Sequence, residues 1–408
     1  MGSRSFLDRL ADDLAAAAGA ARDALLGRTP GEDRFIIALY GGFGNADRAL
    51  VHGRVLRENR IAPAAITHSR WQNVLAMVRR IHADPLRHAT VRVSIGSASV
   101  DVMSDDEGFF HASLPVATDA MRAGDDWTRV DAKLVDAPAS EVATIPNVDA
   151  RGRILVPAGS PRLLVISDVD DTVLHSNATS LIAALRTMLF ENARTRLPFP
   201  GVAAFYHALR AGRSGTDGNP VFYVSSSPWN LYDVISEFLD AQGIPAGPIM
   251  LRDVDIGFDV LSSQHHHTHK RAMVRRVLTT YPGVPVILIG DSGQEDPEIY
   301  RDVVHEFPSR IAAVYIRNVT PNPERSTVIR RLAEEVLAAG SSLVLADDTL
   351  AAARHAAEHG WIAQDSVSAV SEEKRKDEGT TPGKADAPGA RDAGEGPPPT
   401  IIEAPPPE

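Results

Sequence analysis

The sequence contains no cysteine among its 408 residues. This absence excludes disulfide bonds, catalysis by a thiolate, and zinc or iron–sulfur sites built from cysteine. It is compatible with a reducing cytoplasm, where structural disulfides are rare. Catalytic or metal-binding chemistry in this chain therefore has to use oxygen and nitrogen atoms.

Long apolar runs are also absent. No window approaches the roughly 18 apolar residues of a membrane span. The N-terminus carries Asp8, Asp12 and Asp13 where a secretory signal needs an apolar core. We therefore expect a cytoplasmic protein without a transmembrane segment, at most peripheral to a membrane.

An excess of positive charge is missing as well. The chain has 42 Lys and Arg against 53 Asp and Glu, a net charge of −11, which argues against non-specific binding of nucleic acid. From Asp365 to the end there are ten acidic and five basic residues, so this tail carries −5 and the rest −6. We expect no nucleic-acid partner, although a nearly balanced body can still approach an anionic surface through a local patch.

What the sequence does have is apolar content, 44% of all residues, which is enough for folded cores. Residues 1–30 have the spacing of an amphipathic helix, which we expect to pack on a neighbouring domain rather than on a membrane. Residues 31–150 hold short alternating runs between turns, typical of a β-sandwich-like domain. Residues 364–408 are acidic and proline-rich, which predicts a disordered tail.

Residues 151–363 alternate continuous apolar runs with helical segments. Such strands, joined by helices, form a parallel sheet that is covered on both faces. The pattern predicts an α/β fold with a central parallel sheet. Because ligands bind beyond the carboxyl ends of parallel strands, polar residues directly after an apolar run are the candidates for function.

The first such cluster is LLVISDVDDTV, where Asp168, Asp170, Asp171 and Thr172 follow a buried strand. Carboxylates at a strand end can bind Mg²⁺, which prefers oxygen ligands. An aspartate can also attack phosphorus, and a second one two residues later points to the same side and can act as acid and base. Asp171 and Thr172 are expected to support the turn.

Three further signals follow later strands. Ser225 and Ser226 end the run VFYVSSS, where a hydroxyl and backbone N–H groups can hold a phosphoryl oxygen. Lys270 begins a predicted helix and can neutralise negative charge. Asp291 ends VILIGD and can complete a metal shell, while Asp296 can position Lys270. Singly these signals are weak, but together they lie at one edge of one predicted sheet.

The motifs SDVDDTV, YVSSSPWNLY, HKRAMV and IGDSGQEDPEIY resemble those of the haloacid dehalogenase (HAD) superfamily. More narrowly, they resemble the catalytic domain of the actin-patch-type phosphatidate phosphatases. YGGFGNADRALVHGRVL is similar to the N-terminal region of many members. The resemblance covers about Arg34 to Ile362 and implies a Rossmann-like HAD domain behind the β-rich domain.

The resemblance also implies roles for individual residues. Asp168 would be the nucleophile and Asp170 the general acid and base. Asp168, the carbonyl oxygen of Asp170 and Asp291 would hold Mg²⁺. An aspartate at the second position is the phosphatase pattern of the superfamily, since its ion pumps carry threonine there.

The same resemblance implies that Ser225, with Ser226, and Lys270 bind the transferring phosphoryl group. Thr172 and Asp296 would support the site. The activity implied is Mg²⁺-dependent hydrolysis of a phosphate monoester through an aspartyl-phosphate, with phosphatidate as the substrate of this family and diacylglycerol as its product.

The spacing of the motifs bears on the substrate. The chain between Thr172 and Ser225 has room for a helical hairpin but not for a large lid. An open site suits a phosphate on a bulky or membrane-bound molecule. A capped site would suit a small metabolite, because closure of the cap excludes water. Two alternatives stay open: a phosphatase for phosphoproteins or other bulky soluble esters, and a non-catalytic scaffold with a vestigial HAD domain. The complete set of site residues argues against the scaffold.

Two further features have no settled role. The run QHHHTH, from Gln264 to His269, is interpreted as a polar loop beside Lys270. A Zn²⁺ or Ni²⁺ site and a contact to an anionic headgroup are the alternatives. Ile401 and Ile402 lie between proline runs and form a candidate docking motif. A protein partner is therefore expected to bind through the β-rich domain or this tail.

Overall fold

The structure is a computed structural model of the 408-residue chain. The residues that it describes are 34–58, 84–121, 125–140, 142, 147–169, 200–252, 263–319, 322–379 and 400–402. Within these ranges, no helix is both long and apolar enough to cross a membrane. The chain divides into two compact units, one of Met1–Ala158 with Asn230–Val234 and one of Gly159–Trp229 with Ile235–Glu408.

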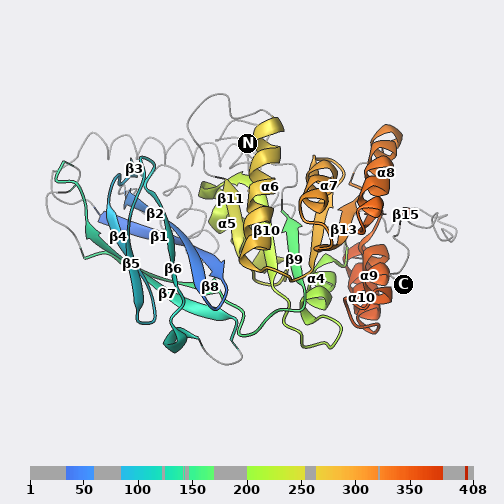
Figure 1. Ribbon diagram of the computed structural model, residues 1–408, viewed down its shortest axis with the longest axis horizontal. Coiled ribbons are helices and arrows are strands. Elements are labelled where there is room, and N and C mark those ends of the chain that lie inside the picture. The colour runs from blue at the N-terminus through green and yellow to red at the C-terminus, as the bar shows by residue number, and fades with distance from the viewer. Residues whose placement is uncertain are drawn as a thin grey trace, which may run out of the picture. The chain divides into compact units, whose positions relative to one another are not determined.

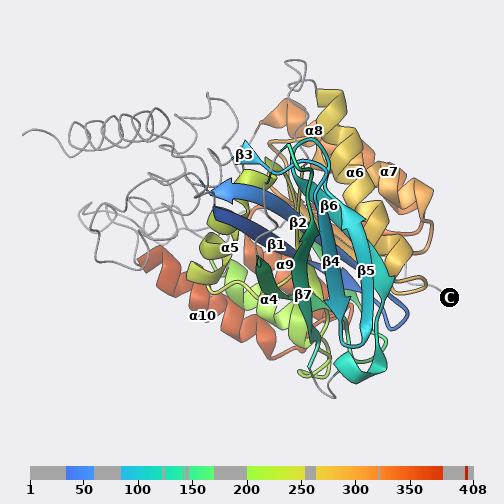
Figure 2. The same ribbon diagram turned by 90° about the vertical axis from the view of Figure 1, so that its left-hand side faces the viewer.

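The first unit is built on a mixed sheet, sheet A (Figure 2). The strand order is β3-β2-β1-β8-β7-β4-β5, with β6 paired to β2, and only β1 and β8 pair in parallel. Its elements are β1 (Arg34–Gly44), β2 (Arg48–Glu58), β3 (Asp84–Pro85), β4 (Thr90–Ile95), β5 (Ala98–Met103), β6 (Phe109–Pro115), the 3₁₀ turn η1 (Thr118–Ala120), β7 (Trp127–Asp136) and β8 (Asp149–Leu155).

Sheet A curls because β6 pairs with β2 and also packs against β5. Its concave side encloses a core that includes Val51, Val93 and Phe110, all fully buried. The β-rich prediction agrees with this unit, but the described strands form one hydrogen-bonded sheet where we expected a sandwich. Alternation indicates which side chains are buried and does not tell which strands pair. The unit also runs to Ala158, beyond the predicted end at residue 150, because β8 pairs with β7.

The second unit is built on sheet B, whose order is β11-β10-β9-β12-β13-β14-β15. The first six strands are parallel, and β15 is antiparallel to β14. The strands are β9 (Leu164–Asp168), β10 (Val221–Pro228), β11 (Ile249–Arg252), β12 (Val286–Asp291), β13 (Ile311–Arg317), β14 (Ser342–Ala346) and β15 (Thr400–Ile402).

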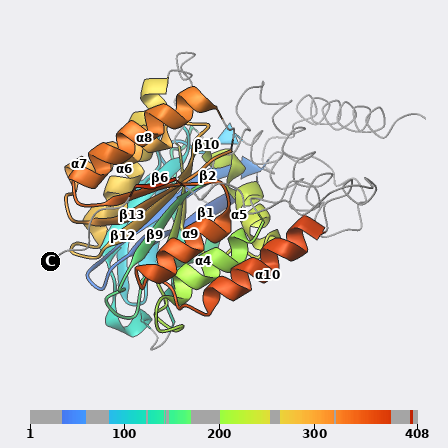
Figure 3. The same cartoon turned by 90° about the vertical axis from the view of Figure 1, so that its right-hand side faces the viewer.

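Helices cover both faces of sheet B, so that α6, α7 and α8 lie on one face and α4, α9 and α10 on the other (Figures 1 and 3). The bounds are α4 (Val202–Ala211), the 3₁₀ turn η3 (Trp229–Leu231), α5 (Tyr232–Ala241), α6 (Ser263–Thr280), α7 (Asp296–Glu306), α8 (Pro323–Ala338), α9 (Thr349–Glu358) and α10 (Ser366–Gly379). This arrangement explains why β9, β12 and β14 are buried along their whole length. The predicted α/β architecture is confirmed at this level.

The strand order of sheet B indicates where along the sheet a ligand is expected to bind. Counted along the chain from β9, the parallel strands run 3-2-1-4-5-6 across the sheet. The winding therefore reverses between β9 and β12, which are neighbours. Open α/β sheets bind ligands outside the carboxyl ends of the strands at such a reversal.

Helix α10 lies within residues 364–408, where we expected a disordered tail. Val370 is fully buried, and Glu373 and Asp377 accept hydrogen bonds from the backbone N–H groups of Ala204 and Gly201, at 2.6 and 2.8 Å. These two carboxylates thus satisfy the start of α4, where helix N–H groups lack partners and negative charge is favourable. The acidic composition predicted that these residues lie in a disordered segment, which is wrong for this helix.

The candidate docking motif is also engaged within the chain. Residues Thr400–Ile402 form β15, and Ile401 and Ile402 pair with Val344 and Leu343 of β14. This pairing covers the edge of sheet B at β14, where unpaired backbone groups would otherwise be available to another strand.

Candidate active site

Three strand ends bring the predicted residues to one edge of sheet B. Asp168 is the last residue of β9 and lies opposite Val224 of β10, so Ser225 follows directly beside it. Asp291 is the last residue of β12, the other neighbour of β9. Parallel pairing therefore places Asp168, Ser225 and Asp291 side by side, as the sequence predicted.

Lys270 reaches this edge from α6. Its Nζ lies 2.7 Å from Oδ1 of Asp168 and 2.7 Å from Oδ1 of Asp296. All three side chains are almost completely buried. A buried charge is tolerated only when it is paired, and here one ammonium group is held between two carboxylates.

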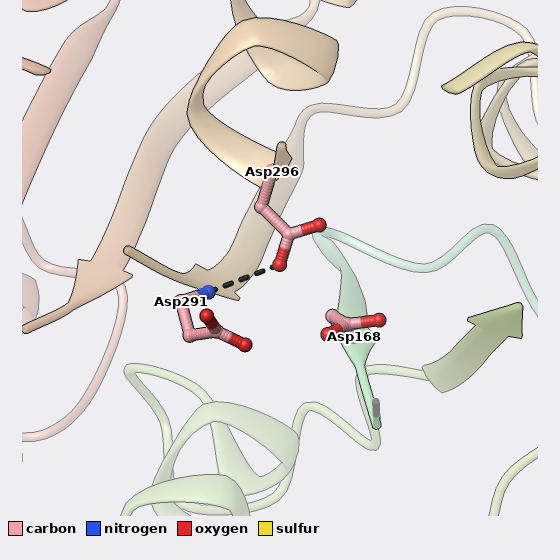
Figure 4. A group of neighbouring side chains, drawn as sticks. All are labelled: Asp168, Asp291 and Asp296. Atoms are coloured by element: carbon pink, nitrogen blue, oxygen red, sulfur yellow. Dashed lines mark hydrogen bonds between the residues drawn. The ribbon is translucent and has the colours of Figure 1, made fainter. Parts of the chain in front are cut away.

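Asp296 is the first residue of α7, and its carboxylate connects Lys270 to the end of β12. Its Oδ1 accepts the hydrogen bond from Lys270, and its Oδ2 accepts one from the backbone N–H of Asp291 at 3.0 Å (Figure 4). Gly290 makes room for this side chain, since a Cβ at Gly290 would lie 2.4 Å from Oδ2 of Asp296. Both Asp296 oxygens thus have partners in the protein.

Asp291 differs from Asp296 in having an unsatisfied oxygen. Its Oδ1 accepts hydrogen bonds from the N–H groups of Gly293 and Gln294, at 2.7 and 3.1 Å. Its Oδ2 is buried and has no hydrogen-bond partner among the described residues. Burial, with the charge of Asp296 as the next cause, raises the pKa of Asp291 to about 6. The charges of Arg317 and Lys270 act in the opposite direction and lower this pKa, but they do not outweigh burial.

The acidic residues fit a divalent cation. Single carboxylate oxygens of Asp168, Asp291 and Asp296 lie within 4.8 Å of one another (Figure 4), the one such group of three or more within the described residues. Carboxylate oxygens are the ligands of hard divalent cations, and the orphaned Oδ2 of Asp291 would gain a partner. Because both oxygens of Asp296 are already engaged, Asp168 and Asp291 are the better ligands.

Three serines lie near the carboxyl end of β10. Ser225, Ser226 and Ser227 are buried, and Oγ of Ser225 accepts a hydrogen bond from the N–H of Ser227 at 2.9 Å. This bond lies in the part of β10 that directly follows Val224, the partner of Asp168. The roles of Ser225 and Ser226 toward a phosphoryl group stay predictions.

Three predicted residues lie outside the described part of the chain. Asp170 and Thr172 belong to residues 170–199, so the positions of the second aspartate and of the supporting threonine stay predictions, as does that of Asp171.

The histidine run is not the loop that we expected. Gln264–His269 lies in α6, so Lys270 is in the interior of the helix rather than at its start. Nε2 of His267 is 3.6 Å from Oδ2 of Asp302 on α7. The polar composition of the run suggested a loop, but the helix begins seven residues before Lys270, at Ser263.

Sequence reasoning missed Arg325, in the first turn of α8. Its guanidinium group donates hydrogen bonds to the carbonyl oxygens of Ser292 and Gln294, in the loop between Asp291 and Asp296. A cation near a helix N-terminus opposes the helix dipole. That local conflict, three residues after the N-cap Asn322, is the signal that could have pointed to it.

Comparison with known proteins shows which family the segment with this site is similar to. Residues 163–318 match the family model "Phosphatidate phosphatase APP1, catalytic domain". The phosphatidate phosphatase APP1 of Saccharomyces cerevisiae is 29% identical over 153 residues, which are 38% of this chain and 25% of that protein. An uncharacterized protein of Schizosaccharomyces pombe is 28% identical over 200 residues, 46% of this chain and 28% of that protein. The chain thus spans about a quarter of the length of these relatives.

Solved structures add no argument about function. A β-glucuronidase of Bifidobacterium dentium is aligned over 77% of this chain and 53% of its own, with 12% identity and a TM-score of 0.24. A carbohydrate acetylesterase of Xanthomonas citri is aligned over 74% of each chain, with 12% identity and a TM-score of 0.25. The matched segment, by contrast, contains Asp168, Lys270 and Asp291. Residues 163–318 of this chain are therefore similar to the catalytic domain of the APP1-type phosphatidate phosphatases.

Proposed function

We propose that this chain is a Mg²⁺-dependent phosphatase that hydrolyses a phosphate monoester through an aspartyl-phosphate, with a lipid phosphate such as phosphatidate as substrate. The observation that carries the proposal is the buried triad in which Lys270 lies 2.7 Å from both Asp168 and Asp296, inside the segment that matches the family. The strand order of sheet B is compatible with the Rossmann-like fold of the HAD superfamily, which is part of the proposal.

In the first step a carboxylate oxygen of Asp168 attacks phosphorus. The bond between phosphorus and the ester oxygen breaks, and the leaving alcohol takes a proton from the carboxylic acid of Asp170. The products are an aspartyl-phosphate at residue 168 and the free alcohol, which is diacylglycerol if the substrate is phosphatidate. Lys270 stabilises the negative charge of Asp168 before the attack and that of the phosphoryl group during it.

In the second step Asp170, now ionised, takes a proton from water. The water oxygen attacks phosphorus, the bond to Asp168 breaks, and inorganic phosphate leaves. Ser225 and Ser226 hold the phosphoryl oxygens in both steps. When bound by Asp168, Asp291 and the carbonyl oxygen of Asp170, Mg²⁺ would supply positive charge that orients the phosphoryl group and neutralises its oxygens.

A lipid phosphate is the proposed substrate class. It is supported by the matched family and by the yeast relative, which is named for phosphatidate. A phosphoprotein or another bulky soluble ester is the competing substrate class.

The mechanism is tested by hydrolysis of p-nitrophenyl phosphate with and without Mg²⁺. Asp168→Asn is expected to lower kcat by more than about a thousand-fold, because the nucleophile is lost. Asp240→Asn, at an exposed residue of α5, is the control and should match the wild type. Activity without added metal in chelator, or equal rates for Asp168→Asn and wild type, would refute the mechanism. No hydrolysis by the wild type with Mg²⁺ would favour a scaffold.

The substrate class is tested separately with the wild-type protein. Dioleoyl phosphatidate in mixed micelles should give a higher kcat/KM than soluble phosphate esters or a phosphopeptide. A clear preference for the phosphopeptide or the soluble esters would overturn the lipid assignment and leave the chemistry intact.

A further inference from the structure

The loop between β12 and α7 links two residues of the candidate site. Asp291 ends β12 and Asp296 begins α7, so Ser292–Glu295 determines how the two carboxylates are placed. Within the loop, the N–H groups of Gly293 and Gln294 bond to Oδ1 of Asp291. A shift of the loop backbone would therefore rotate Asp291 and displace its Oδ2.

Arg325 holds the outer side of this loop. Its Nε donates a hydrogen bond to the carbonyl oxygen of Ser292 at 2.9 Å, and its Nη2 donates one to the carbonyl oxygen of Gln294 at 2.5 Å. The two carbonyls belong to the same short segment whose N–H groups bond to Asp291. The guanidinium group therefore orients the peptide units that in turn orient the carboxylate.

Arg325 is itself held in place from two sides. Nη1 and Nη2 donate to the two carboxylate oxygens of Glu298, in the first turn of α7, with Nη2 at 2.9 Å from Oε2. The backbone N–H of Arg325 donates to Oδ1 of Asn322, the N-cap of α8. The hydrogen bond that Arg325 donates to Glu298, together with the charges of Glu298, Asp291 and Asp296, raises the pKa of Arg325 against the effect of burial. A bidentate arginine has the geometric precision that a positioning role needs.

A second arginine separates this role from helix packing. Arg301 of α7 also joins α7 to α8, since its Nη1 donates to Oε2 of Glu335 at 2.7 Å. Its Nε donates to Oδ1 of Asp302, and neither bond involves the Ser292–Glu295 loop. Arg301 is therefore a matched control for the loss of an arginine between these helices.

We propose that Arg325 is a positioning residue that holds the Ser292–Gln294 backbone so that Asp291 faces Asp168, and that it thereby sets the affinity of the site for its divalent cation. The inference rests on the proposed function and extends it, because Arg325 lies beyond residues 163–318, which match the family. The active unit then needs α8 in addition to the matched segment.

The test compares Arg325→Met, Arg325→Lys and Arg301→Met in the full chain. Removing an outer partner of metal ligands typically weakens metal affinity by about ten- to a hundred-fold. We expect that increase in the Mg²⁺ concentration for half-maximal hydrolysis of p-nitrophenyl phosphate by Arg325→Met, with a smaller change in kcat at saturating Mg²⁺. Arg301→Met should stay within about twofold of wild type. Arg325→Lys should lie in between, because one ammonium cannot bond to both carbonyls and to Glu298.

A second readout does not depend on turnover. Mn²⁺ titration followed by thermal unfolding should show that Arg325→Met needs more metal than wild type or Arg301→Met for the same rise in Tm. If Arg325→Met fails to fold by circular dichroism, the same criteria are applied to Arg325→Lys.

Two outcomes would overturn the inference: Arg325 variants that match Arg301→Met in both metal titrations, or variants that lose kcat with an unchanged metal requirement. Failure of the proposed function looks different, because the wild type itself would then show no metal-dependent hydrolysis, while the Mn²⁺ titration would still report on Arg325.

Discussion

In sheet A the strands bury one face, whereas in sheet B the central strands are buried throughout. Along β7 the buried residues Thr128, Val130, Ala132 and Leu134 alternate with more exposed ones, while every residue of β9 and β12 is buried. Charged side chains of sheet A can therefore point to solvent at many positions. In sheet B they gather where the strands end, and there they need partners.

Two ion pairs of the same length illustrate the difference. Arg92 and Asp101 pair across β4 and β5 at 2.7 Å, with side chains 50% and 42% exposed. Lys270 and Asp168 also pair at 2.7 Å, with side chains 2% and 3% exposed. An exposed pair adds little to stability because water competes for both charges. Breaking a buried pair leaves a charge without solvent, so distance alone does not measure the importance of a contact.

The largest effect is expected for Lys270→Met, which breaks the buried triad. It leaves Asp168 and Asp296 without their shared cation. We expect loss of phosphatase activity and a decrease of about 3–5 kcal/mol in the free energy of unfolding of the second unit. Urea denaturation followed by circular dichroism measures the change. A variant as stable as the wild type would show that burial does not make this pair important.

Gly290→Ala comes next and tests the packing of Asp296. The new Cβ would lie 2.4 Å from Oδ2 of Asp296, so the side chain has to move away from the N–H of Asp291. We expect a loss of about 1–3 kcal/mol, as for other overpacked sites, together with lower activity. Gly152→Ala in sheet A is the control, since the nearest atom there is the flexible end of Leu39 at 3.3 Å. Equal effects in the two sheets would contradict the close-packing argument.

The helices around sheet B also bury a histidine, which predicts a pH effect. Burial, and then the neighbouring His359, lowers the pKa of His355 to about 4 from its usual 6.5. The unfolded chain thus binds a proton below pH 6.5 that the folded chain does not, so stability falls as the pH decreases from 6.5 toward 4.

For His355 this linkage amounts to about 1 kcal/mol between pH 7.5 and 5.5. Urea midpoints measured at the two pH values should differ more for the wild type than for His355→Gln. If the two proteins show the same pH dependence, His355 does not titrate as described.

The smallest effect is expected for Arg92→Met in sheet A. The exposed pair with Asp101 competes with water and salt, so the urea midpoint of the first unit should not change measurably. A clear destabilisation would remove the contrast between the two sheets.

Sequence patterns predicted much of the second unit because two regularities coincide there. Apolar strands such as LLVIS and VILIG mark buried parallel strands, and the residues directly after them reach the same edge of the sheet. For this reason Asp168, Ser225 and Asp291 were predicted from order alone, and the pairing of Lys270 with Asp296 followed from charge.

Other features were not readable from local patterns. The polar composition of the histidines before Lys270 predicted a loop, and the charged composition of α10 predicted a disordered tail. Both segments are helical. In α10, Glu373 and Asp377 have partners at the start of α4, about 170 residues away in sequence. Similarly, alternation in the first unit indicated one buried face without telling how the strands pair.

By itself, the sequence determined which residue types are available to the chemistry: aspartate, lysine and serine at strand ends, and no thiol. It also determined the parallel α/β character of the second unit, since apolar continuity is a local property. Only the tertiary structure decided that Asp296 has both oxygens occupied and that Arg325 reaches the loop beside Asp291. It also decided that Oδ2 of Asp291 has no hydrogen-bond partner within the part of the chain that the structure describes. The reason is physical: hydrogen-bond satisfaction depends on groups that converge from distant parts of the chain, and no local pattern records which of them meet.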